Sequence, residues 1–242
     1  MIPLLLLLLA LAPVAALAVY VYKKDTYEKE PLRFLVRAFI GGAVVTLYAL
    51  AAEMAVHPFI ASVPFKAVRF LLFAFISAGL IEEGAKYFRF RTLVYGDRNF
   101  NEPFDAIVYA VMISLGFAAL ENVGVAASLF FTKGAGVSFA VVIMRALISV
   151  PAHACFAMIM GHYFALARFG DADSRFVNIA KALWVPALLH GAFDFFLFVK
   201  MGAGLLFLAV LLRVAWLAAF SVMKQASDGS PFNPHVDQGK DR

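Results

Sequence analysis

Long apolar runs separated by short polar stretches dominate the chain. A helix needs about 20 apolar residues to cross a bilayer, and in lipid it satisfies all of its own backbone hydrogen bonds. Seven runs fit this pattern: 1–22, 34–56, 67–81 and the residues after it, 104–131, 138–167, 182–199 and 202–223. The pattern predicts an all-α, polytopic membrane protein with about seven transmembrane helices. Pro151 interrupts the run 138–167, which predicts either a tilted or kinked helix or an interfacial helix that turns into a span.

Composition supports a membrane protein and leaves no room for a separate soluble domain. The 242 residues are 63% hydrophobic and 15% charged, and the mean hydropathy is +0.85. We therefore expect one transmembrane domain over 1–224, with a catalytic core at about 67–199, followed by a disordered cytoplasmic tail over 225–242. The single cysteine excludes an intramolecular disulfide. The sequence leaves the oligomeric state open.

Lysine and arginine fall in alternate loops, which predicts the orientation of the chain. Cytoplasmic loops retain basic residues. The loops after the first, third and fifth runs, together with the tail, contain fourteen, whereas the opposite loops contain only Lys66, Lys133 and Lys200. We expect an external N-terminus, a cytoplasmic C-terminus and a multi-pass location in the cell membrane. Lys23 and Lys24 follow the first run, so we expect that run to be retained as a span and not cleaved as a signal. Because the basic residues separate apolar runs and form no stripe, no nucleic-acid partner is expected.

Ionisable residues inside the apolar runs are the candidates for chemistry. Glu82 and Glu83 end an apolar run, and a carboxylate in the bilayer costs about 2.5 to 3.5 kcal/mol on insertion scales, so it normally carries function. Residues three or four apart share a helix face, which pairs both glutamates with Lys86 and pairs His190 with Asp194. At about 1.5 Å per residue, six ionisable residues overlap in depth: Glu82, Glu83, Glu121, His153, His190 and Asp194. The pattern predicts one buried polar site.

Each motif also has a structural interpretation. The Glu82-Glu83-Gly-Ala-Lys86 segment could be a helix end that faces water, and Asp105 could be a carboxylate at a helix N-terminus. Asn122 could only join helices, His153 could be a core histidine, and Asp194 could only orient His190. The three other histidines are given no role in the site: His57, His162 and His235.

The ordered motifs resemble the PrsW family of intramembrane proteases, which is related to the type II CAAX prenyl endopeptidases and their bacterial relatives. The resemblance covers about 73–196 and rests on Glu82-Glu83-Gly-Ala-Lys86, Phe104-Asp-Ala-Ile-Val-Tyr109, Gly116-Phe-Ala-Ala-Leu-Glu121-Asn122, His153 and His190-Gly-Ala-Phe-Asp194. The CAAX enzymes have arginine after the double glutamate, Phe-x-x-x-His and His-x-x-x-Asn. Lys86, Glu121 and Asp194 depart from that pattern and favour PrsW.

The resemblance implies cleavage of a peptide bond in a membrane-anchored protein, which for PrsW is an anti-sigma factor. It implies that the six overlapping ionisable residues are catalytic and that Lys86, Asn122 and Asp105 support them. The lipid bilayer and a protein substrate are the expected partners.

Two mechanisms remain open at this level. Without a metal, Glu82 takes a proton from water, His153 and His190 donate to the oxyanion, and Asp194 orients His190. With zinc, His153, His190 and a carboxylate from Glu121 or Asp194 bind the ion, and Glu82 or Glu83 is the base. The negative charge that Glu121 adds favours the metal-bound mechanism, with His153, His190 and Glu121 as ligands.

Two other classes of function compete with the protease. An ion- or proton-coupled carrier would use the same buried ionisable residues as a relay. No repeat or pair of broken helices typical of transporters is found in the sequence, which counts against a carrier. A membrane scaffold would use the polar residues only to hold helices together.

Overall fold

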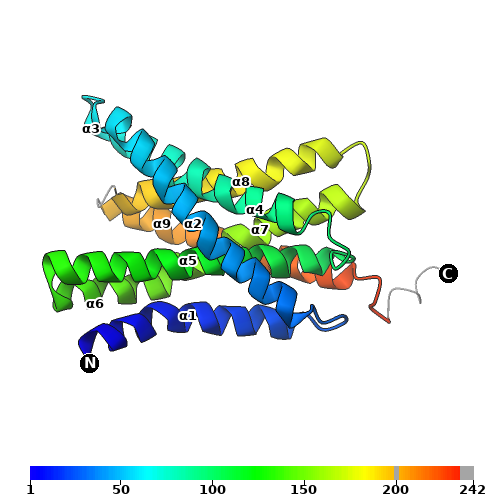
Figure 1. Cartoon of the computed structure of the whole chain (residues 1–242). Helices are drawn as coiled ribbons and strands as arrows, with labels where there is room; N and C mark the ends of the chain where they lie inside the picture. The colour runs from blue at the N-terminus through cyan, green and yellow to red at the C-terminus, as the bar shows by residue number, and fades with distance from the viewer. Residues whose placement is uncertain (199–201, 235–242) are drawn as a thin grey trace.

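The chain is described by a computed structural model over residues 1–198 and 202–234. These residues form helices and no strand (Figure 1): α1 Ile2–Lys24, α2 Leu32–Ala61, α3 Lys66–Leu72, η1 Phe73–Glu82, α4 Glu83–Leu93, α5 Pro103–Lys133, α6 Ala135–Met144, η2 Arg145–Ser149, α7 Val150–Phe169, α8 Arg175–Phe198 and α9 Gly202–Asp228. Within the described ranges, six helices are long and apolar enough to cross a membrane. The prediction of an all-α, multi-pass membrane protein is confirmed.

The run predicted to start at residue 67 forms one continuous helix made of α3, η1 and α4. Its middle, η1, is π-helical, and Glu82 is the last residue of this stretch. A second π-helical stretch, η2, lies directly before Pro151, inside a continuous helix from Ala135 to Phe169. Proline cannot donate the backbone bond that an α-helix requires, so the distortion falls in the preceding turn. The run 138–167 is thus one helix with a local distortion before Pro151. Such π-helical stretches are frequent at functional sites.

Helix α5 lies at the centre of the bundle. In its most apolar window 89% of the residues are buried, against 17% for α1 and for α9. Figure 1 shows α2 crossing α5 obliquely, and glycines allow the two backbones to touch at the crossing. A Cβ added at Gly116 would lie 1.9 Å from the Phe39 carbonyl oxygen, and one added at Gly42 would lie 1.8 Å from that of Ile113. The helix that carries Glu121 is therefore fixed against α2.

The helix with the two glutamates packs equally closely against α8. A Cβ at Gly79 would lie 2.5 Å from the Ala187 carbonyl oxygen, and a Cβ at Gly191 would lie 2.5 Å from Phe75 Cδ1. Gly79 precedes Glu82 by one turn, and Gly191 follows His190 directly. This approach of η1 to α8 brings Glu83 and His190 within hydrogen-bonding distance.

The C-terminal segment differs from the prediction at its start. Helix α9 continues to Asp228, so residues 225–228, expected in the disordered tail, are helical. Ala226 is buried in the main core, which explains why the helix does not end at Gln225. Residues 235–242, with His235, Lys240 and Arg242, lie outside the described residues, as do Val199 and Lys200. The orientation in the membrane stays a prediction.

Candidate active site

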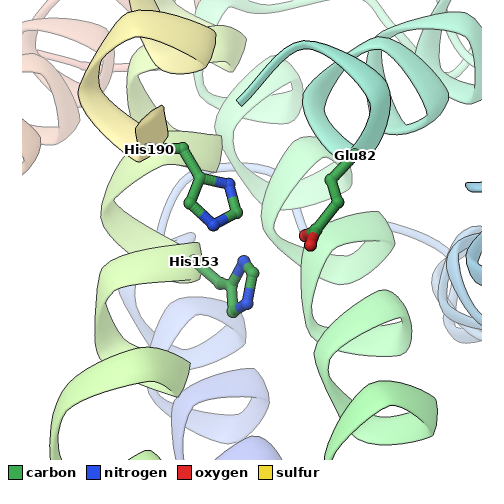
Figure 2. A group of neighbouring side chains, drawn as sticks. All are labelled: Glu82, His153 and His190. Carbon is green, nitrogen blue, oxygen red and sulfur yellow. The ribbon is translucent and has the colours of Figure 1, made fainter. Parts of the chain in front are cut away.

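Three side chains from three separate helices converge in the interior of the bundle. Glu82 comes from the end of η1, His153 from α7 and His190 from α8, and Figure 2 shows the three pointing toward one another. One ligand atom from each lies within 4.8 Å of the others, and the residues are 8%, 4% and 3% exposed, respectively. His153 and His190 follow Glu82 by 71 and 108 positions in the sequence, yet all three share one small polar space in an apolar surrounding.

Glu83 and Lys86 hold one side of this space. The Lys86 ammonium donates to Glu83 Oε1 at 2.7 Å, and it lies 3.6 Å from Glu82 Oε2. His190 Nδ1 lies 2.8 Å from the same Glu83 oxygen, so Nδ1 carries the hydrogen and Nε2 remains free of hydrogen bonds to the described residues. Glu83 is fully buried; the Lys86 ammonium compensates its charge, and the His190 imidazole donates a further hydrogen bond to it.

Glu121 holds His153 from the other side. The Lys86 ammonium donates to His153 Nδ1 at 3.1 Å, which assigns the hydrogen to Nε2, and Nε2 lies 3.2 Å from Glu121 Oε2. Arg145 Nη2 lies 2.8 Å from Glu121 Oε1, and its Nε donates to Asn122 Oδ1 at 2.6 Å. Arg145 was given no role from the sequence, because depth along a helix does not reveal which side chains meet.

Glu82 lines two cavities. The first, about 480 Å³, is lined by α2, η1 and α8 and contains Asp194 in its wall. The second, about 630 Å³, is lined by α2, η1 and α5 and contains Glu121. Glu53 and Glu82 border both.

Two residues at these cavities were missed from the sequence. Glu53 is the only acid in the run 34–56, and the cost of a carboxylate in lipid was the signal that could have found it. His57, placed at a loop by the sequence, belongs to α2 and lines the first cavity with Glu82.

The structure brings most of the predicted site residues together. Glu82, Glu83, Glu121, His153 and His190 are linked as described, with Lys86 between them. Asp194 lines the first cavity together with Glu82. Asn122 contacts Arg145 and also donates to the Ala10 carbonyl oxygen on α1. The group with ligand atoms in metal-binding range contains Glu82, whereas the sequence suggested Glu121 as the carboxylate ligand.

Asp105, predicted as a supporting residue, belongs to a second cluster beside the loops. Its Oδ2 accepts the backbone N–H groups of Asn101 and Glu102 and closes a capping box at the start of α5, as its structural interpretation requires. Its neighbours in this loop cluster are Asp25, Glu30 and Glu102, all at most 4% exposed. The Tyr109 hydroxyl donates to Glu30, and the Ser230 hydroxyl donates to Glu102.

The carboxyls of the loop cluster bind protons more strongly than usual. Burial raises the pKa of Asp25 to about 6 and that of Glu102 to about 7. Burial, together with a hydrogen bond to Asp105 and the charge of Asp105, raises the pKa of Glu30 to about 10. Glu30 is therefore neutral at pH 7 and can donate a hydrogen bond to Asp105.

The donor set at Glu82, His153 and His190 fits a divalent metal ion. Two imidazoles and one carboxylate form a familiar ligand set of catalytic zinc. Glu82 Oε2 is buried and has no hydrogen-bond partner among the described residues. The Glu83 bond to His190 and the Glu121 bond to His153 are the carboxylate contacts that typically orient metal-binding imidazoles. His153 would bind the ion through Nδ1, so the Lys86 ammonium, which donates to that atom, would have to move away from it.

Comparison with known proteins identifies the relatives of this chain. The profile described as "PrsW family intramembrane metalloprotease" matches residues 30–222. "Protease PrsW" of Geobacillus kaustophilus (strain HTA426) is 38% identical over 221 residues, which cover 89% of each chain. "Protease PrsW" of Bacillus subtilis (strain 168) is 37% identical over 194 residues, 77% of this chain and 80% of the relative. That of Clostridioides difficile (strain 630) is 32% identical over 87% of both. No solved structure matches the chain.

These matches and the buried Glu/His cluster agree on one function, and they do not support the carrier. The expected protein substrate follows from the protease family, and the expected bilayer follows from the spans. The chain belongs to the PrsW family and is a multi-pass intramembrane protease.

Proposed function

We propose that this protease cuts a membrane-anchored protein in the cell membrane and that zinc, held by Glu82, His153 and His190, is required. The observation that carries the proposal is the convergence of three buried ligand atoms within 4.8 Å of one another. An anti-sigma factor is the substrate class that the family resemblance suggests.

The surrounding residues hold the proposed ligands in place. Glu83 accepts from His190 Nδ1 and so turns the free Nε2 toward the shared space. Glu121 fixes the ring of His153 through Nε2, and the arginine at 145 fixes Glu121. The ion supplies Lewis acidity, which lowers the pKa of a bound water toward neutrality.

Proton transfer from water needs a further carboxylate, and we assign this role to Asp194. Asp194 is one helical turn beyond His190 on α8 and lines the same cavity as Glu82. It makes no hydrogen bond or ion pair with the described residues, whereas Glu83 and Glu121 are both engaged. In this assignment Glu82, the base expected from the sequence, becomes a ligand.

Zinc content and cleavage, measured together, test the proposal. The purified protein and its variants are incubated with a panel of single-pass membrane peptides. Glu82→Gln and His190→Ala should lose both bound zinc and cleavage. Asp194→Asn should retain zinc and lose cleavage by at least about 100-fold, the lower range for a general base. His162→Ala, on α7 outside the cluster, is the matched histidine control and should keep both.

Specific outcomes would contradict the proposal. Full activity in protein that contains much less than one zinc ion per chain, and that keeps this activity when a chelator is added, would exclude the metal. Loss of zinc in Asp194→Asn would make Asp194 a ligand and not the base.

A further inference from the structure

The two cavities beside Glu82 have three lining residues in common, and we treat them as the two arms of one substrate groove. They share Leu50, Glu53 and Glu82, so the arms meet where the proposed zinc ligand lies. Their volumes of about 480 and 630 Å³ each accommodate several side chains. A peptide bond placed at Glu82 would therefore have groove on both sides.

The lining of both arms is mainly apolar. The first arm is bordered by Met54, Phe73, Ala78 and Phe198, and the second by Leu47, Phe117, Leu120 and Leu129. Such a surface fits the apolar side chains of a membrane segment that has lost its helical structure around the scissile bond. Charged side chains are the exception in this lining.

Negative charge exceeds positive charge around the groove. Five carboxylates border or adjoin it: Glu53, Glu82, Glu83, Glu121 and Asp194. Among the described residues, two cations form ion pairs with them, Lys86 with Glu82 and Glu83, and Arg145 with Glu121. Glu53 has no hydrogen bond or ion pair with the part of the chain that the structure describes. It comes from α2, whereas the proposed zinc ligands come from η1, α7 and α8. Glu53 is therefore placed to contact substrate without belonging to the catalytic network.

We propose that Glu53 determines substrate specificity by pairing with a lysine or arginine side chain of the bound segment, close to the scissile bond. Charge complementarity supports this occupant, because a cation from the substrate would neutralise a carboxylate that the protein leaves unpaired. The inference rests on the proposed cleavage of membrane-anchored proteins.

A lysine scan of one substrate tests this pairing. A single-pass host peptide with an uncharged segment is made with one lysine at each position from four before to four after the scissile bond. Wild type should cut one register at least about tenfold faster in kcat/KM than the uncharged host, the size of a close charge pair across an interface. Glu53→Gln should remove the preference, and Glu53→Lys should transfer it to glutamate at the same register.

Controls separate recognition from structural damage. Asp171→Lys makes the same charge change at an exposed residue between α7 and α8 and should keep the lysine preference. Zinc content should not change in Glu53→Gln. Glu53→Asp, which retains the charge on a shorter side chain, should keep the preference at a reduced size. If Glu53→Lys fails to fold, the lysine scan with wild type and Glu53→Asp still tests the pairing of Glu53 with a substrate lysine.

The outcomes distinguish this inference from the proposed function. Cleavage of the uncharged host without any effect of lysine would overturn the inference alone. A lysine preference that persists in Glu53→Gln would also overturn it. If wild type cut none of the peptides, that result would instead contradict the proposed function.

Discussion

Two groups of buried carboxylates lie in this chain, and their charge is compensated in opposite ways. The proposed catalytic cluster, called the catalytic cluster below, contains Glu82, Glu83 and Glu121 and has an ammonium and a guanidinium within ion-pair distance. The loop cluster contains Asp25, Glu30, Glu102 and Asp105. None of these four carboxylates takes part in an ion pair with residues 1–198 and 202–234. Lys29, which precedes Glu30 in the sequence, donates to the backbone oxygens of Tyr22 and Asp25 instead.

This difference is consistent with a chemical role for the catalytic cluster and a structural role for the loop cluster. Fixed cations leave carboxylate lone pairs available for a metal or a proton, whereas protons occupy them. The loop cluster joins the segment after α1, the start of α5 and Ser230 after α9 through hydrogen bonds. Comparable substitutions should therefore have unequal effects in the two clusters.

Removing the cation of the catalytic cluster should have the largest effect. Lys86→Met leaves two buried glutamates without their cation, and breaking a buried pair in this way costs about 3 to 5 kcal/mol. We expect a marked loss of thermal stability in detergent and no cleavage. The double variant Lys86→Met/Glu83→Gln, which removes both charges of the pair, should recover most of the stability but not the activity. Wild-type stability of Lys86→Met would show that the pair is not what compensates Glu83.

Glu83→Gln alone should affect activity more than stability, because Lys86 keeps a second carboxylate, Glu82, at 3.6 Å. The amide can still contact His190, but it is a weaker acceptor and no longer compensates Lys86. Loss of a carboxylate that orients a metal-binding imidazole typically costs about 10- to 100-fold in metal affinity or activity. Zinc titration and cleavage rates measure both. An unchanged zinc affinity with unchanged cleavage would remove Glu83 from the catalytic cluster.

The next effect tests how the catalytic cluster is assembled. Gly79→Ala places a methyl group 2.5 Å from the Ala187 carbonyl oxygen and so pushes η1 away from α8. Overpacking of this kind costs about 1 to 3 kcal/mol, and displacement of Glu83 from His190 should also lower cleavage. Gly84→Ala is the matched control, because nothing lies within 4 Å of the added Cβ. Equal behaviour of the two variants in thermal unfolding and cleavage would contradict the close approach.

The sequence predicted the spans well because transfer into lipid depends on composition and length alone. It also predicted that Glu82, Glu83, Glu121, His153 and His190 lie at one depth, and the structure links them. The contact of Arg145 with Glu121 depends on how two helices are rotated about their axes, and depth along the chain carries no information on that rotation. Glu53 was missed for a related reason: a single acid offers no spacing pattern, and the packing of α2 beside η1 is what places it in the wall of the same cavities as Glu82.

Stability of the loop cluster should fall as pH rises. Asp25 and Glu102 have pKa values of about 6 and about 7 in the folded chain, above the ordinary values of 3.8 and 4.5. The folded state holds these protons more tightly, so their contribution is fully present below about pH 4 and is lost as pH rises through 6 to 7. Thermal unfolding between pH 5 and pH 8 should show this decline. Asp25→Asn and Glu102→Gln should flatten it, and a flat wild-type profile would argue against protonation.

The smallest effect should come from Glu30→Gln, the counterpart of Glu83→Gln in the loop cluster. Glu30 is neutral at pH 7, and a glutamine can replace both of its contacts by accepting from Tyr109 and donating to Asp105. We expect a change in unfolding free energy below about 1 kcal/mol, the net size of one hydrogen bond, with cleavage unchanged. As pH approaches about 10, wild type should lose stability through ionisation of Glu30, and the variant should not. A loss of several kcal/mol at pH 7 would mean that the Glu30 carboxylate is charged and paired, and the contrast between the two clusters would then disappear.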